Sequence, residues 1–169
     1  MLRRIGAPEG DILAVQANLA NTYRALGRPE ETLRVRRDVY SGRLKLNGED
    51  DGLTLSAANN LAHSLLHLER FEEAKSLFRK VIPVARRVLG ERNELMLGMR
   101  WNYAKALYLD DGATLDDLHE AVTTLEDTER TARRVLGGAH PLTNNIEGDL
   151  REARAALRAR ETPSPPVSA

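Results

Sequence analysis

The sequence predicts an all-α fold, an α-solenoid of about seven helices arranged as antiparallel pairs. Three observations predict it. Short motifs return at a fixed interval, apolar residues follow helical spacing within each interval, and the composition is rich in Leu, Ala and Val but only 4% aromatic. Such a composition favours helices over a β-rich fold. One helix pair cannot bury its apolar stripe alone, whereas stacked pairs can, so the repeats are expected to form one array.

The repeat interval is 42 residues and then lengthens to 47. An Asn-Leu-Ala or Asn-Tyr-Ala motif recurs at residues 18–20, 60–62 and 102–104. The motif Arg-Arg-Val-Leu-Gly occurs at residues 86–90 and again at residues 133–137. The five extra residues fall near Asp110–Thr114, between two helical patterns, where an insertion costs little free energy.

Each interval contains two helical patterns. Within residues 71–89 the apolar positions alternate between spacings of three and four, as one buried helical face requires. Pro83 lies inside this pattern and is expected to bend the helix without ending it. The first helices are predicted at residues 11–26, 53–68, 94–109 and 141–159. The second helices are predicted at residues 29–46, 71–89 and 115–136.

These patterns predict one repeat domain at residues 1–160 and a disordered tail at residues 161–169. The repeats are expected at residues 11–52, 53–94 and 95–141, followed by a capping helix at residues 141–160. At the other end, Arg3-Arg4-Ile5-Gly6 is typical of the last turn of a second helix whose beginning is missing. We therefore expect the chain to be the C-terminal piece of a longer array.

Several motifs together carry a family resemblance. They are Asn60-Leu61-Ala62, Leu65, Phe71-Glu72-Glu73-Ala74, Phe78, Arg86-Arg87-Val88-Leu89-Gly90 and the His140-Pro141 junction. The repeats resemble tetratricopeptide repeats, in the longer version found in kinesin light chains. The resemblance covers nearly all of the chain except the tail and implies a right-handed superhelix. Thr32 departs from the pattern, because the family has alanine at that close helix contact.

The resemblance implies a site as well as a fold, because in this family the first helices line a concave groove that binds peptides. The residues expected there are Asn21, Arg24, Asn59, Asn60, His63, His67, Trp101, Lys105 and Tyr108. Asn side chains can bond an extended peptide backbone, the cations can pair with acidic side chains, and Trp101 and Tyr108 offer flat apolar area. The expected ligand is a peptide with acidic and apolar character.

Structural roles remain open for the same residues. Trp101 can instead pack into the neighbouring repeat, and the Asn18, Asn60 and Asn102 series can instead tie neighbouring helices together. The charge run Arg34–Asp38 is interpreted as a solvated helix face whose like charges are balanced by nearby acids. His63 and His67 are four residues apart but have no evident third metal ligand, so no metal site is expected. A calcium loop at residues 47–58 is equally disfavoured, because Ala58 stands where a glutamate is required.

Composition limits the remaining classes. Lys plus Arg and Asp plus Glu both number 25, which argues against a nucleic-acid binder and gives no reason to expect a membrane. Cysteine is absent, and no nucleophile elbow or phosphate-binding glycine loop occurs, so neither catalysis nor a cofactor is expected. The sequence predicts a cytoplasmic, non-catalytic protein–protein interaction scaffold. The alternative is a C-terminal regulatory or assembly fragment of a larger protein with a catalytic or zinc-binding domain upstream.

Overall fold

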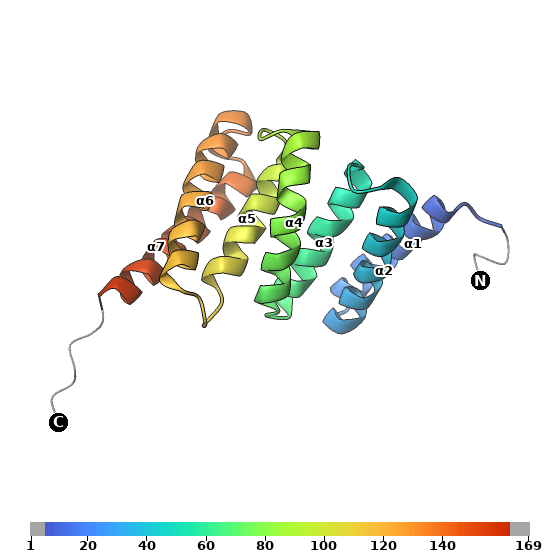
Figure 1. The fold of residues 1–169 in the computed structure, drawn as a ribbon, viewed down its shortest axis with the longest axis horizontal. Coiled ribbons are helices and arrows are strands. Elements are labelled where there is room, and N and C mark those ends of the chain that lie inside the picture. Colours follow the sequence, from blue (N-terminus) through green and yellow to red (C-terminus); the bar gives the residue numbers. More distant parts are fainter. Residues whose placement is uncertain (1–5, 163–169) are drawn as a thin grey trace, which may run out of the picture.

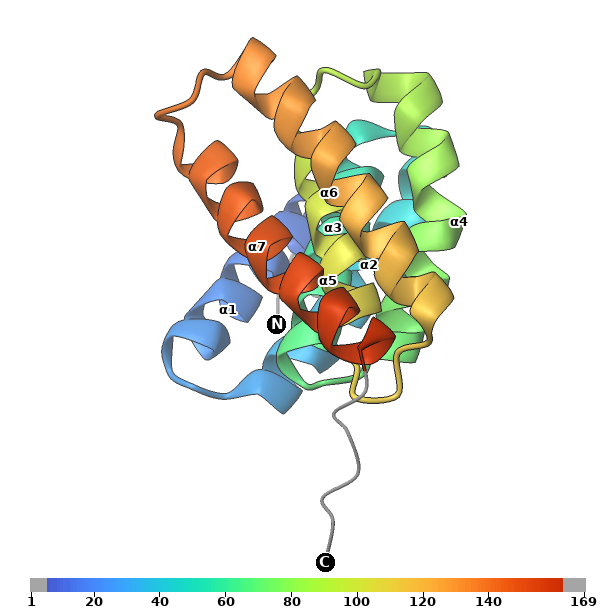
Figure 2. The ribbon, with the colours of Figure 1, turned by 90° about the vertical axis from the view of Figure 1, so that its left-hand side faces the viewer.

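The computed structural model describes residues 6–162, and within that range the chain forms seven α-helices and no strand. Their bounds are α1 Glu9–Ala25, α2 Pro29–Asn47, α3 Gly52–His67, α4 Phe71–Leu89, α5 Glu94–Tyr108, α6 Leu115–Val135 and α7 Pro141–Glu161. Each helix packs against the next along the chain (Figure 1). Viewed along the long axis, α2, α4 and α6 form one layer and α1, α3, α5 and α7 form the other (Figure 2). The predicted all-α solenoid is confirmed, and every predicted helix boundary lies within two residues of the observed one.

Local sequence explains where α3, α5 and α7 begin. The carboxylate of Asp51 accepts hydrogen bonds from the first-turn amides of α3, and the side chain of Asn93 does the same for α5. The imidazole Nδ1 of His140 accepts from the amide of Leu142, while Pro141 takes the first helical position of α7. The His-Pro junction therefore works as a helix start.

Pro83 lies within α4, which continues to Leu89, so the prediction that proline does not end this helix is confirmed. No helix in residues 6–162 has the length and apolar character needed to cross a bilayer.

The five-residue insertion becomes the loop between α5 and α6. Thr114 and Asp117 form a reciprocal capping box that starts α6. The guanidinium of Arg160, near the end of α7, donates to the carbonyls of Ala113 and Asp111 at 3.1 and 2.9 Å. The insertion is thus held against the last helix.

The core is continuous from α2 to α7, and it depends on one recurrent contact. Phe78 of α4 and Leu125 of α6 occupy the same position of successive repeats, and both are fully buried. The ring of Phe78 meets the ring of Tyr103 of α5 edge to face, with centroids 6.2 Å apart. These side chains connect each second helix to the first helices beside it.

Two expectations about the termini fall largely outside this description. Residues 1–5, which carry most of the Arg3–Gly6 motif, and residues 163–169 of the expected tail are not among the described residues. The predicted fragment character and the predicted disordered tail stay predictions.

Replacing Phe78 by Ala is expected to lower the free energy of unfolding by about 3–5 kcal/mol, because it leaves a cavity at this recurrent contact. Phe78→Leu, which copies the residue of the third repeat, is expected to cost about 1–2 kcal/mol. Urea unfolding followed by circular dichroism measures both. A cost below about 1 kcal/mol for Phe78→Ala would show that the contact does not organise the core.

Candidate functional site

All nine groove residues predicted from the sequence lie on α1, α3 and α5, but the structure divides them among three surroundings. One group lies between α5 and α7, a second along α3, and a third beside a hollow between α1 and α3. The groups differ mainly in how many of their polar and charged atoms have hydrogen-bond or ion-pair partners within the protein.

The group between α5 and α7 is largely satisfied by acids of α7. The indole Nε1–H of Trp101 donates to the carboxylate of Asp149. The ammonium of Lys105 lies 5.1 Å from the centre of the Trp101 ring and 4.0 Å from Asp149. Trp101 is partly buried and packs on the core, so the structural role left open by the sequence is observed, while its role in binding a ligand stays a prediction.

Tyr108 is less accessible than predicted. Its side chain is buried, and its hydroxyl lies 3.2 Å from a carboxylate oxygen of Glu152, to which it donates. Burial, and then the negative charge of Asp149, raise the pKa of the Tyr108 hydroxyl well above its usual value. This tyrosine joins α5 to α7 and offers little surface to a ligand.

The asparagine series is not a uniform ladder. The amide of Asn102 is buried and donates to Oδ1 of Asn59 at 3.3 Å, which ties α5 to α3. Asn18 and Asn60 are exposed, and it is their backbone carbonyls that accept side-chain hydrogen bonds, from Thr22 and Arg36. The structural role holds for Asn102, and Asn60 remains available on the surface.

His63 and His67 pack edge to face on α3, with ring centroids 4.5 Å apart. Burial, assisted by the nearby His67, Arg36, Lys105 and Arg24, lowers the pKa of His63 to about 4. Burial also lowers the pKa of His67, again assisted by Lys105, Arg24 and Arg36. Both imidazoles are therefore mostly neutral at pH 7 and lie in positively charged surroundings.

Beside the third group lies a residue of α2 that contradicts the interpretation of Arg34–Asp38 as a solvated face. Arg36 is only 6% exposed and points between α1 and α3 rather than into solvent. Its Nη1 donates to the carbonyl of Asn60 at 2.7 Å and to Oγ of Ser64 at 2.8 Å, and Nη2 lies 3.4 Å from Oδ1 of Asn21. Burial, and then the charge of Arg24, lower the pKa of Arg36.

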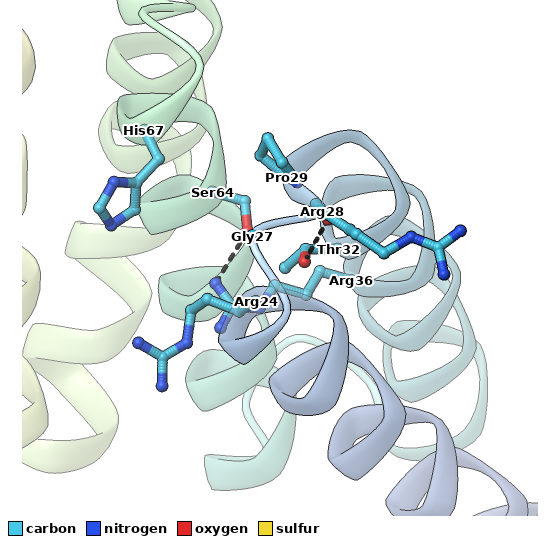
Figure 3. Close-up of a pocket in the computed structure, with 8 residues that line it drawn as sticks. All are labelled: Arg24, Gly27, Arg28, Pro29, Thr32, Arg36, Ser64 and His67. Atoms are coloured by element: carbon cyan, nitrogen blue, oxygen red, sulfur yellow. Dashed lines mark hydrogen bonds between the residues drawn. The ribbon is translucent and has the colours of Figure 1, made fainter.

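Arg36 separates two hollows between α1 and α3. The larger has a volume of about 470 Å³ and is lined by Arg24, Gly27, Arg28, Pro29, Thr32, Arg36, Ser64 and His67. Figure 3 shows these side chains, with Arg24 and His67 on one side and the guanidinium of Arg28 extending to the other. The smaller hollow, of about 120 Å³, is bordered by Asn21 and Asn60. The space between α1 and α3 thus contains two hollows on either side of Arg36.

The repeat register could have revealed Arg36, although the composition of its own helix could not. Counting 42 residues from Arg36 gives Phe78, and counting a further 47 gives Leu125. A charged residue at a position that is apolar in the other repeats is the signal. The same register relates Thr32 to Ala74, and Thr32 is accommodated by donating its hydroxyl to the carbonyl of Arg28 at 2.8 Å. No comparable pattern in the sequence indicated that Asp149 and Glu152 of α7 would bind the groove residues of α5.

Comparison with known proteins agrees with the geometry. Residues 11–87 match the sequence model of the tetratricopeptide repeat family. The resemblance to tetratricopeptide repeats is confirmed. The tetratricopeptide-like array matches a solved structure from Podosopora anserina, described as kinesin light chain TPR-like repeats, with a TM-score of 0.79 and 21% identity. That match covers 92% of this chain and 71% of the other.

Two further structures match. A second structure of the Podosopora anserina repeats has a TM-score of 0.76 and 22% identity, covering 88% of this chain and 68% of the other. BtubC (BKLC) of P. vanneervenii has a TM-score of 0.59 and 19% identity, covering 96% of this chain and 70% of the other. At these identities the likeness establishes the fold alone. No curated protein sequence matches the chain significantly.

His63 predicts a defined pH dependence of stability. Its pKa is about 4 in the folded chain and near 6.5 when unfolded. Above pH 6.5 neither state is protonated, and between pH 6.5 and 4 only the unfolded state binds the proton, so stability falls as pH is lowered through this window. His63→Gln is expected to remove about 1–2 kcal/mol of that loss, allowing for the partial exposure of the ring. Urea unfolding at pH 7 and pH 4 measures the difference, and identical pH dependence in both proteins would contradict this assignment.

Proposed function

We propose that this chain is a non-catalytic scaffold that binds a peptide segment of a partner protein along its first-helix face, in a cytoplasmic setting. The observation that carries the proposal is the arrangement of this layer. Exposed Arg24 and His67 border the hollow between α1 and α3, and partly exposed Lys105 and Trp101 continue the same layer on α5. A stacked array presents such side chains to one extended ligand.

The chemistry of the face supports a peptide with acidic and apolar character. Arg24, Arg36 and Lys105 all lower the pKa of both His63 and His67, so the surroundings of these rings favour negative groups. Trp101 supplies accessible aromatic surface of the kind that concentrates binding energy in protein interfaces. The exposed side chain of Asn60 can offer both a donor and an acceptor to a peptide backbone.

The proposal is tested with peptides selected from a random display library against the full chain. Trp101 is the only tryptophan, so its fluorescence reports binding from within the proposed site. Replacing Arg24, His63 and Lys105 together by Gln is expected to weaken binding of the selected peptides by about tenfold or more, because the charge-assisted hydrogen bonds of the two cations and the contact of the neutral imidazole are lost.

The matched control is Arg34→Gln with Arg134→Gln, which removes two positive charges from exposed positions of α2 and α6. This variant is expected to bind as the unmodified chain does. Unchanged affinity in the folded first-helix variant, or an equal loss in the control, would contradict the proposed face.

A further inference from the structure

Arg36 carries a buried positive charge that no acid of residues 6–162 neutralises. Its hydrogen bonds go to a carbonyl, a hydroxyl and an amide oxygen, all of them uncharged. The charged group that most affects it is another cation, Arg24. Burying a charge without an opposite partner costs several kcal/mol unless polar groups compensate it.

Other arginines near helix interfaces are paired with an acidic side chain. Between α6 and α7, Arg154 contacts Glu126 at 2.6 Å, and Arg133 forms an ion pair with Glu147. Arg28, beside Arg36, is bound by Glu31 and lies over the ring of Tyr23 at 4.9 Å. The uncompensated charge is therefore a local feature of the space between α1 and α3.

Packing does not require an arginine at this position. The corresponding residues Phe78 and Leu125 are fully buried and complete the core of their repeats. Arg36, by contrast, borders the 470 Å³ hollow. Replacing a buried charge by an apolar residue of similar volume is often neutral or stabilising, so stability alone does not account for Arg36.

Arg36, which lines the hollow, has hydrogen-bond donors that the protein does not use. Nη1 of Arg36 is occupied by Asn60 and Ser64, whereas Nε and one Nη2 proton have no acceptor among the described residues. Adjacent Nε–H and Nη2–H groups match the two oxygens of one carboxylate. Arg24 and His67 line the same hollow, and Figure 3 shows both on the side away from Arg28.

We propose that this hollow is a subsite for the carboxylate of an aspartate or glutamate side chain of the bound peptide. Arg36 binds the carboxylate through its free edge, Arg24 supplies a second positive charge from α1, and His67 closes the α3 side. The assignment rests on the proposed peptide-binding function and deepens it. It places the acidic residue of the ligand between the first two repeats, beside the α1–α2 turn.

A single side-chain carboxylate provides the test, because it needs no knowledge of the full ligand. The probe is N-acetyl-glutamate α-amide, the neutral comparator is N-acetyl-glutamine amide, and the dianionic comparator is N-acetyl-O-phosphoserine amide. NMR signals of the His67 imidazole are followed on titration into the full chain at low salt. The glutamate probe is expected to shift them saturably with millimolar affinity, and the glutamine probe is not.

Three variants locate the effect. Arg36→Leu, which copies Leu125, is expected to stay folded and to weaken the glutamate probe by about tenfold. Arg24→Gln changes an exposed residue and is expected to weaken it several-fold. Arg34→Gln removes the same charge from the outer side of α2 and is expected to leave the affinity unchanged.

Equal titration of the unmodified chain and Arg36→Leu would overturn the subsite, as would the absence of saturable binding. Binding of the phosphoserine probe more than about tenfold tighter than glutamate would overturn the carboxylate assignment. A comparable affinity for the two anions would leave it standing. If the glutamate probe does not bind but display-selected peptides do, only the carboxylate subsite is contradicted. If display-selected peptides do not bind either, the proposed peptide-binding function is contradicted.

Discussion

The insertion of one side chain from each second helix against the flanking first helices is the contact on which this array depends. In the second and third repeats that side chain is Phe78 or Leu125, and the surrounding core is continuous. A solenoid has no distant contacts to compensate for a poor interface, since each repeat touches only its neighbours. The identity of this one residue therefore decides how closely successive repeats approach.

The first repeat departs from this rule, and the departure has a consequence for function. Arg36 of α2 donates to the carbonyl of Asn60 and the hydroxyl of Ser64 on α3, and its Nη2 lies 3.4 Å from Oδ1 of Asn21 on α1. These polar contacts border a hollow and lie beside a small buried apolar cluster of Ala20, Val35, Val39 and Ala57. At the other end of the layer, Asp149 and Glu152 of α7 engage Trp101, Lys105 and Tyr108. The polar side chains of α5 in the first-helix layer are thus paired with acids of α7, whereas the arginines Arg24, Arg28 and Arg36 surround the hollow between α1 and α3.

The periodic part of this structure could be predicted from the sequence. Helix boundaries and the harmless position of Pro83 follow from local spacing and from capping residues such as Asp51 and His140, which act within a few residues. The state of each site residue could not be predicted in the same way. Trp101 and Asp149 are 48 residues apart, and the sequence near either residue does not predict the hydrogen bond between them. The charged neighbours of Arg36 predict an exposed side chain, and only its alignment with Phe78 of the next repeat indicates that it points inward.

Mapping a bound peptide onto the chain tests the central claim most directly. The backbone amides of the isotopically labelled chain are assigned by NMR, and a display-selected peptide is titrated into it. The account predicts that the largest shifts lie on the exposed faces of α1, α3 and α5, around Arg24, His67 and Lys105. Shifts concentrated on the outer faces of α2, α4 and α6 would contradict it.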